Sequence, residues 1–157
     1  MNRIFRLFGL IVLAFGLMIG GAIANAADRQ GATVSPLTAD DASDQASAAG
    51  CPSGSYSFQT PWGLGGCAAC QDGCAIDVFW NDGHEEDFAI GSDHQVYRAL
   101  NGAQHWTSMG GWAKDSISAY YWHDTYATID VIGRDSRHWC SSWTGSSWQS
   151  WHRCEGS

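Results

Sequence analysis

Residues 122–151 have the sequence WHDTYATIDVIGRDSRHWCSSWTGSSWQSW, and a similar stretch lies about 42 residues earlier in the chain. At this offset, and without gaps, Phe79-Trp80 aligns with Tyr121-Trp122. The other aligned pairs are Asp82 and Asp124, Ile90-Gly91 and Ile132-Gly133, Asp93 and Asp135, Tyr97 and Trp139, and Trp106 and Trp148. A repeat of roughly 40 to 45 residues is typical of the blades of β-propellers. The spacing therefore predicts two copies of one structural unit.

Short β-prone segments separated by Gly- and Asp-containing turns predict four strands in each repeat. The expected strands are 75–80, 87–90, 95–100 and 106–109, followed by 117–122, 128–132, 137–141 and 148–151. Before them, Tyr56 and Phe58 alternate with polar residues and predict a further strand, and residues 67–74 predict a tight loop. Residues 62–66 (Trp-Gly-Leu-Gly-Gly) resemble residues 106–111, so a third, partial copy precedes the two full ones. We expect an all-β fold of about two four-stranded blades.

The first 50 residues differ in composition from the rest. Residues 1–26 combine Arg3 and Arg6 with an apolar run and an Ala-Asn-Ala ending, which predicts a signal peptide; a retained membrane anchor is the alternative. Residues 27–50 contain no aromatic residue and predict a disordered linker. The remaining residues, 51–157, are enough for one small domain.

The charge of the chain limits its partners. Without Arg3 and Arg6, six basic side chains remain against 16 acidic ones, a net charge of −10. Binding to nucleic acid requires Lys and Arg to neutralise phosphates, so the composition disfavours nucleic acid, and it equally disfavours anionic membranes once the signal peptide is removed. The expected partner is neutral or cationic.

The six cysteines predict disulfides in a small exported domain, and hence a secreted or periplasmic location. Cys140 and Cys154 lie on neighbouring segments of the last repeat and are the preferred pair. The remaining cysteines are Cys51, Cys67, Cys70 and Cys74. A redox dithiol at Cys67 and Cys70 lacks a thioredoxin-like context, and a zinc site fits no standard spacing. We therefore expect neither a metal nor a cofactor.

The order of motifs in the repeat resembles that of bacterial β-propeller lectins. It consists of Trp80 or Trp122, a loop, Ile-Gly-x-Asp, an aromatic residue, a second Trp and Gly-Gly. Such lectins are the seven-bladed, fucose-binding type and the related short fucose lectins. The resemblance covers roughly residues 59–151 and implies binding of glycans. It departs in the number of blades and in the cysteines.

Two blades alone leave apolar faces that neighbouring blades would cover. Three arrangements remain open from the sequence. Several chains could close a ring, as in short lectins built from two-blade chains, which makes the protein a possible homo-oligomer. Disulfides could instead stabilise a single chain, or the chain could be a degenerate remnant of a longer lectin.

Sugar sites combine aromatic rings with polar groups that bind hydroxyls. Aromatic and polar residues in the predicted inter-strand loops are therefore the candidates: Trp80, Asp82, Arg98, Trp122, Tyr126, Arg134 and Trp143. We interpret Trp106, Trp139 and Trp148 as packing residues, and Asp93 and Asp135 as turn residues. The acidic run at residues 84–87 is interpreted as a solvated loop.

The leading hypothesis is a secreted, non-enzymatic, lectin-like protein that binds glycans multivalently. The alternative is a disulfide-stabilised protein-interaction or inhibitor module without sugar binding. A small secreted hydrolase is a third class, and it would need a pair of catalytic carboxylates at a set separation in the folded protein.

Overall fold

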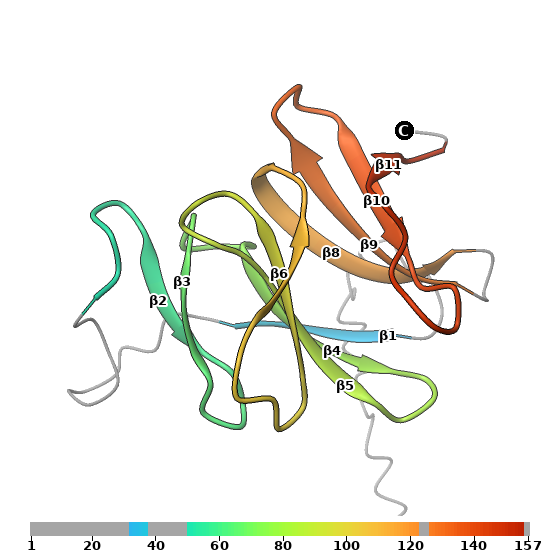
Figure 1. Ribbon diagram of the computed structural model, residues 1–157, viewed down its shortest axis with the longest axis horizontal. Helices are drawn as coiled ribbons and strands as arrows, with labels where there is room; N and C mark the ends of the chain where they lie inside the picture. Colours follow the sequence, from blue (N-terminus) through green and yellow to red (C-terminus); the bar gives the residue numbers. More distant parts are fainter. Residues whose placement is uncertain (1–31, 38–49, 123–125, 156–157) are drawn as a thin grey trace, which may run out of the picture.

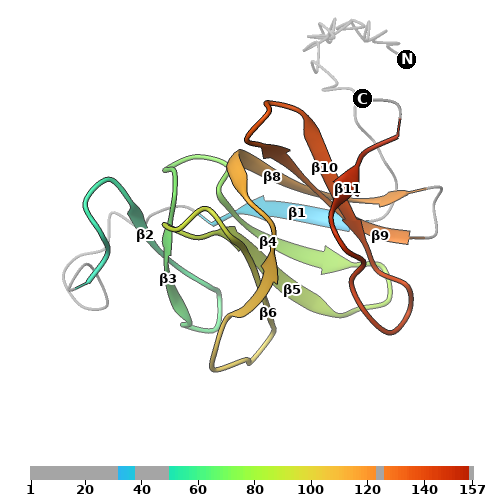
Figure 2. The same cartoon turned by 45° about the horizontal axis from the view of Figure 1, so that its top comes forward.

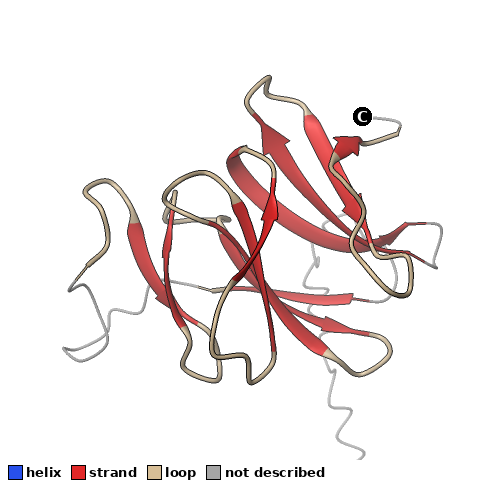
Figure 3. Cartoon of the chain, viewed as in Figure 1, coloured by secondary structure: helices blue, strands red, loops and turns tan. Residues whose placement is uncertain are grey.

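The computed structural model describes residues 32–37, 50–122 and 126–155. These residues form strands, turns and loops, and none of them lies in a helix (Figure 3). Accordingly, the described ranges contain no helix able to span a membrane. The all-β prediction is confirmed, whereas the predicted signal peptide lies outside the described residues.

Eleven strands in the described ranges form three antiparallel sheets. The five-stranded sheet has the order β1 (Ala32–Pro36), β4 (Ala75–Trp80), β5 (Glu85–Ile90), β6 (Val96–Leu100) and β7 (Thr107–Gly110). The four-stranded sheet has the order β11 (His152–Arg153), β10 (His138–Ser142), β9 (Tyr126–Gly133) and β8 (Ala113–Trp122). β2 (Tyr56–Gln59) and β3 (Gly65–Ala68) form a hairpin sheet. The five-stranded sheet lies between the hairpin sheet and the four-stranded sheet (Figures 1 and 2), and β8 packs against β1, β4 and β5.

The first three strands of each repeat have the same register. Every cross-strand pair within β4, β5 and β6 corresponds to a pair within β8, β9 and β10 that lies 42 positions later. Examples are Ala75–Ala89 with Ile117–Val131, and Glu86–Leu100 with Thr128–Ser142. The sequence repeat is therefore a repeat of backbone structure.

Two tryptophans join neighbouring sheets. The indole N–H of Trp106 donates to the carbonyl of Gly65 in the hairpin sheet, at 2.9 Å. The indole N–H of Trp151 donates in the same way to the carbonyl of Met109 in β7, at 3.0 Å. Because each ring directly precedes the fourth strand of its repeat, Trp151 is the structural counterpart of Trp106.

The predicted alignment of Trp106 with Trp148, and the predicted strand 148–151, are wrong. β11 is the fourth strand, and Trp148 lies in a longer loop after β10. Its ring packs edge-on against Phe88, with centroids 5.5 Å apart, and lies 6.3 Å from Trp80. This loop therefore covers the face of the five-stranded sheet, which explains why the loop contains apolar residues.

The two Ile-Gly-x-Asp turns are built alike. The Asp93 carboxylate accepts a hydrogen bond from the Tyr97 hydroxyl at 2.8 Å, and the Asp135 carboxylate accepts one from the Trp139 indole N–H at 3.0 Å. Each carboxylate also accepts a backbone N–H two residues later. The predicted role of both aspartates as turn residues is confirmed.

The glycine of each turn makes room for the aromatic ring. A Cβ placed on Gly91 would lie 2.7 Å from a ring carbon of Tyr97. A Cβ on Gly133 would lie 2.5 Å from a ring carbon of Trp139. A side chain at either position would therefore displace the ring and the hydrogen bond that holds it.

Three disulfides close the chain locally: Cys51–Cys67, Cys70–Cys74 and Cys140–Cys154. The preferred pair, Cys140 with Cys154, is confirmed. All six cysteines take part in these three disulfides. Cys67, Cys70 and Cys74 are therefore not free thiols in the oxidised protein, so neither a zinc site nor a Cys67–Cys70 dithiol applies to it. Disulfides of this kind indicate an oxidising compartment outside the cytosol.

Two sequence predictions about the first repeat need correction. Residues 32–36, assigned to a disordered linker, form β1 and pair with β4; most of the remaining linker lies outside the described residues. The acidic run 84–87, interpreted as a solvated loop, enters β5, where Glu86 and Asp87 are buried. A charged residue in a short strand hides the apolar alternation on which the strand prediction depends.

Asp87 and Asp77 face each other across β5 and β4. Asp87 is fully buried, and no described donor reaches either of its carboxylate oxygens. Burial, and then the neighbouring Asp77 carboxylate, raise the pKa of Asp87 to about 8. The second repeat places Ala119 and Ile129 at these positions, so the buried acid pair is a property of the first repeat alone.

We expect the pH dependence of stability to reveal this pair. Folded Asp87 keeps a proton that the unfolded chain releases near its ordinary pKa, so its contribution is fully present in acid and is lost as the pH rises through about 8. Asp87→Asn should flatten the fall in the free energy of unfolding between about pH 5 and pH 8.5, measured by urea denaturation. Asp72→Asn, at an exposed position, is the control. If the free energy of unfolding of the wild type fell no more steeply over this interval than that of Asp87→Asn, the assignment would be contradicted.

The turn glycines allow a second test. Gly91→Ala and Gly133→Ala should each lower the free energy of unfolding by about 1–3 kcal/mol, because the added methyl group overlaps the ring beside it. Gly65→Ala, where a Cβ meets no atom closer than 3.9 Å, should change it by less than about 0.5 kcal/mol. Equal effects at all three positions in thermal or urea unfolding would argue against the ring-on-glycine packing.

Candidate functional site

Two cavities lie between neighbouring sheets. The first inter-sheet cavity, of about 270 Å³, lies between the hairpin sheet and the five-stranded sheet and is lined by Phe58, Tyr97 and Trp106 among others. The second, of about 470 Å³, lies between the five-stranded and four-stranded sheets, with Trp139 and Trp151 in its wall. Small-molecule sites commonly occur in concave spaces of about this size.

The two inter-sheet cavities are copies of each other. Their corresponding residues at an offset of 42 are Ala89 and Val131, Ser92 and Arg134, Asp93 and Asp135, and Tyr97 and Trp139; at an offset of 45 they are Gly66 and Gly111, Cys67 and Trp112, and Trp106 and Trp151. The offset changes at two loops. The loop of the Cys70–Cys74 disulfide is three residues longer than its counterpart between Ala113 and Ile117, and the loop between β10 and β11 is three residues longer than the loop between β6 and β7. The repeat therefore produces a repeated concave site.

Aromatic rings and one carboxylate form the wall of the first inter-sheet cavity. Phe58 and Trp106 meet edge to face with centroids 5.5 Å apart. Desolvation acts to raise the pKa of Asp93, but hydrogen bonds from Tyr97 and Gln95 outweigh it and lower that pKa. The carboxylate therefore stays ionised, and it accepts hydrogen bonds from Tyr97 and from the backbone and side chain of Gln95.

The second inter-sheet cavity adds a cation to the same plan. The Arg134 guanidinium lies 4.6 Å from the centre of the Trp112 ring, a cation–π contact. The hydrogen bond from the Trp139 indole lowers the pKa of Asp135, so this carboxylate is also ionised. Arg134 and Asp135 thus present a donor and an acceptor beside aromatic rings, a combination suited to sugar hydroxyls.

Three other predicted residues meet at a different place. Trp122, Tyr126 and Trp143 line a cavity of about 330 Å³ on the four-stranded sheet. Residues alternate between the two faces of a strand, and Ile129 and Val131 face the five-stranded sheet while Thr128 lines this cavity. We call it the end-face cavity, because it lies on the face turned away from the other sheets.

Arg98 is a structural residue. Its guanidinium donates to the carboxylate of Glu86 at 2.6 Å, and it lies 5.9 Å from the centre of the Trp143 ring. Burial raises the pKa of Glu86, although Arg98 acts in the opposite direction. Because Glu86 is only 2% exposed, Arg98 serves to neutralise it and is not free to bind a sugar.

Trp80 and Asp82 line none of the three cavities described above. Trp80 is fully buried and packs against Tyr121, Phe88 and Trp148, which contradicts the expectation of an accessible ring. Asp82 lies in the exposed turn after β4 and accepts hydrogen bonds from the backbone and ring of His84. The Trp80 ring is therefore closed to a ligand, whereas Asp82 is exposed.

Sequence reasoning missed Trp112 and Trp151, which line the second inter-sheet cavity beside Arg134. It also assigned Trp139 only to packing, although its ring reaches the cavity wall. The signal was present in the repeat itself, since Gly66-Cys67-Ala68 and Gly111-Trp112-Ala113 share the spacing Gly-x-Ala. Comparing this segment between the copies would have placed Trp112 beside Arg134.

One described cluster has the residue types of a metal site. Asp130, Cys140 and Cys154 bring their ligand atoms within 4.8 Å of one another. The two sulfur atoms form a disulfide, and metals bind the thiolate form of cysteine. In the oxidised protein the cluster therefore lacks the ligands that such a site needs.

Replacing Arg98 tests its assignment. Arg98→Met should lower the free energy of unfolding by about 3–5 kcal/mol in alkaline solution, because the buried Glu86 carboxylate loses its partner. Adding Glu86→Gln to Arg98→Met should recover much of this loss, since the charge is removed as well. If both variants were as stable as the wild type, measured by chemical denaturation, the Glu86–Arg98 pair would not be structural.

Comparison of the chain with models of known protein families found no match. Comparison with curated proteins found none either. The geometry of the cavities is therefore the basis on which a function is proposed.

Proposed function

We propose that the protein is a secreted, lectin-like carbohydrate-binding module that binds glycans in its two inter-sheet cavities. The sheets would then be the blades of an open, propeller-like arc. The observation that carries this proposal is the repetition of one cavity, with an ionised aspartate beside aromatic rings in both copies.

The chemistry of the cavities favours a neutral, hydroxyl-rich ligand. Aromatic rings offer an apolar surface to the C–H side of a pyranose. Asp93 and Asp135 can accept hydrogen bonds from hydroxyl groups, and Arg134 can donate them. This agrees with the resemblance of the sequence to fucose-binding lectins, and L-fucose is therefore the first sugar to test.

The carboxylates of Asp93 and Asp135 are suited to binding a ligand rather than to acid catalysis. Asp93 and Asp135 are held by hydrogen bonds within their own turns, and those bonds keep both pKa values low. A general acid for glycoside hydrolysis needs a raised pKa and a second carboxylate nearby. Among the described residues lining each inter-sheet cavity there is one carboxylate.

Two weak sites in one chain can act together on a branched or clustered glycan. Linking two binding events raises overall affinity by about 10²–10⁴ where the ligand spans both sites. The pair of cavities supplies this within a single chain, so a ring of several chains is not required for multivalent binding.

Replacing the cation of the second cavity provides the test. A glycan array would identify ligands, and calorimetric titration with L-fucose or the strongest hit should then show two sites. Arg134→Ser reproduces the Ser92 of the first cavity and should weaken the second site by at least tenfold, because a charged hydrogen bond contributes about 1.5–3 kcal/mol. The first site should be unchanged.

Arg137→Ser is the matched control, because Arg137 is an exposed arginine of the same turn and does not line the cavity. It should leave both sites intact. A folded, oxidised protein that binds no glycan on the array would contradict the proposal and favour the protein-interaction module instead. Equal loss of binding in Arg134→Ser and Arg137→Ser would show that the second cavity is not the site.

A further inference from the structure

The end-face cavity corresponds to a space that the first repeat fills with its own cation. At the 42-residue offset, Trp122 corresponds to Trp80 and Thr128 to Glu86. Cys140 corresponds to Arg98, whose guanidinium in the first repeat is held by Glu86 and lies near the Trp143 ring. In the second repeat the short Cys140 side chain is tied into a disulfide, and a hollow of about 330 Å³ is left in this region.

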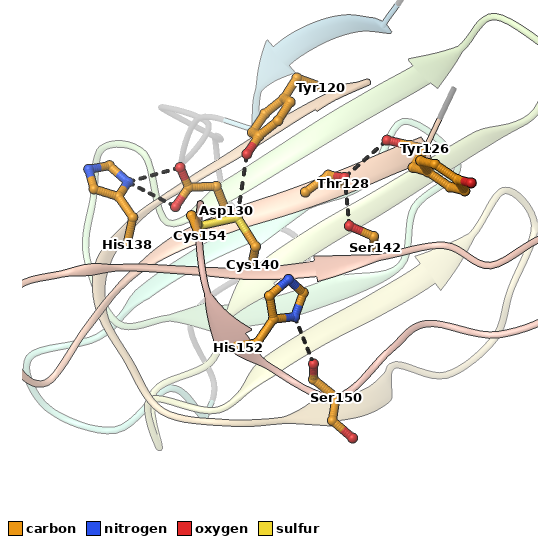
Figure 4. Close-up of a disulfide and its surroundings, with 10 residues drawn as sticks. All are labelled: Tyr120, Tyr126, Thr128, Asp130, His138, Cys140, Ser142, Ser150, His152 and Cys154. Atoms are coloured by element: carbon orange, nitrogen blue, oxygen red, sulfur yellow. Dashed lines mark hydrogen bonds and ion pairs between the residues drawn. A yellow bond between two sulfur atoms is a disulfide. The ribbon is translucent and has the colours of Figure 1, made fainter. Parts of the chain in front are cut away.

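The hydroxyl groups in the wall of this cavity present lone pairs. The Thr128 hydroxyl donates its single proton to the carbonyl of Tyr126 at 3.0 Å. Its contact with the Ser142 hydroxyl, at 2.8 Å, therefore uses the proton of Ser142. Figure 4 shows both bonds beside the Cys140–Cys154 disulfide. Neither hydroxyl keeps a proton for a ligand.

Two further side chains in the wall also present hydrogen-bond acceptors. Thr144 donates its hydroxyl proton to the carbonyl of Ser147 at 3.0 Å. The Nδ1 atom of His152 lies 3.2 Å from the carbonyl of Ser150 (Figure 4), which can only accept, so Nδ1 carries the proton and Nε2 of the neutral ring is an acceptor. These four side chains therefore offer hydrogen-bond acceptors to a ligand.

The end-face cavity is also lined by a negative charge and by aromatic rings. Glu155 contributes a carboxylate, and no Lys or Arg stands among the described residues that line the cavity. Trp122, Tyr126 and Trp143 contribute aromatic rings to the lining, and the faces of such rings carry negative electrostatic potential. The Arg98 guanidinium already lies over the Trp143 ring, 5.9 Å from its centre, so Trp122 and Tyr126 are the main contributors. A chain with a formal net charge of −8 adds a long-range attraction for cations.

We propose that the end-face cavity binds an organic ammonium ion. Aromatic rings with a carboxylate at the rim are the arrangement that recognises alkylated ammonium groups. A hard metal ion would require several oxygen ligands in place of the rings, and an anion would meet the like charge of Glu155 with no Lys or Arg among the described lining residues. This site is separate from the inter-sheet cavities, and its ligand is of a different class from the glycans proposed for them.

Choline and its neutral isostere, 3,3-dimethylbutan-1-ol, test the role of charge. The two molecules have nearly the same shape, so burial of apolar surface contributes equally to both. Choline should quench or shift tryptophan fluorescence of the oxidised protein and bind about tenfold more tightly than the alcohol, as a cation–π contribution of 0.5–2 kcal/mol implies. Equal binding of the two molecules, or no binding of choline at millimolar concentration, would overturn the proposal.

Variants at Tyr126 locate the site. Tyr126 is 50% exposed, so Tyr126→Ala removes a ring without leaving a buried void. It should weaken choline binding about three- to tenfold, while Tyr126→Phe, which keeps the ring, should bind as the wild type does. Glu155→Gln should weaken binding more at low salt than at high salt. Unchanged affinity in Tyr126→Ala would place choline elsewhere and refute the assignment.

Arg134→Ser separates this site from the glycan sites. It should leave choline binding unchanged, since Arg134 lines a different cavity. Glycan binding by Tyr126→Ala should likewise match the wild type and also serves as a check on folding. A choline affinity that falls with Arg134→Ser would show that choline binds in the second inter-sheet cavity, against the proposal.

Discussion

The close packing of an aromatic ring on a glycine in each Ile-Gly-x-Asp turn is the constraint on which the structure depends. Gly91 and Gly133 let the rings of Tyr97 and Trp139 lie directly on the backbone. The aspartate of the turn then fixes each ring by a hydrogen bond. Because the same rings line the inter-sheet cavities, one local device holds the turn, spaces the sheets and forms the wall of the candidate site.

Features set by short-range pattern could be predicted from the sequence, and features set by distant pairing could not. The turns, β4 and the three-strand register follow from local alternation and from the 42-residue repeat. β1 depends on pairing with β4 across some 40 residues, and its sequence carries little apolar signal. The shift from 42 to 45 residues occurs in loops, where insertions leave no periodic trace, so Trp148 was aligned in place of Trp151.

The candidate site shows a second limit of sequence reasoning. Trp80 and Trp122 occupy the same position of the repeat, yet Trp80 is fully buried and Trp122 lines a cavity. The difference comes from the neighbouring sheet, because the loop with Trp148 covers the face of the five-stranded sheet. Residue type and position in a repeat therefore identify a side chain that could bind a ligand, but its accessibility is decided by what packs against it.

The face that carries the end-face cavity also bears on whether a further sheet would pack against it. Where the first repeat has Ile76, Phe88 and Val96 facing the next sheet, the second has Ser118, Asp130 and His138. The Asp130 carboxylate lies 2.9 Å from the His138 ring, and burying such a pair under a further blade would cost several kcal/mol of desolvation. Terminal units of repeat proteins characteristically carry a polar outer face. These substitutions favour a single disulfide-stabilised chain over a ring closed through this face, and they leave that face open to solvent and to small ligands.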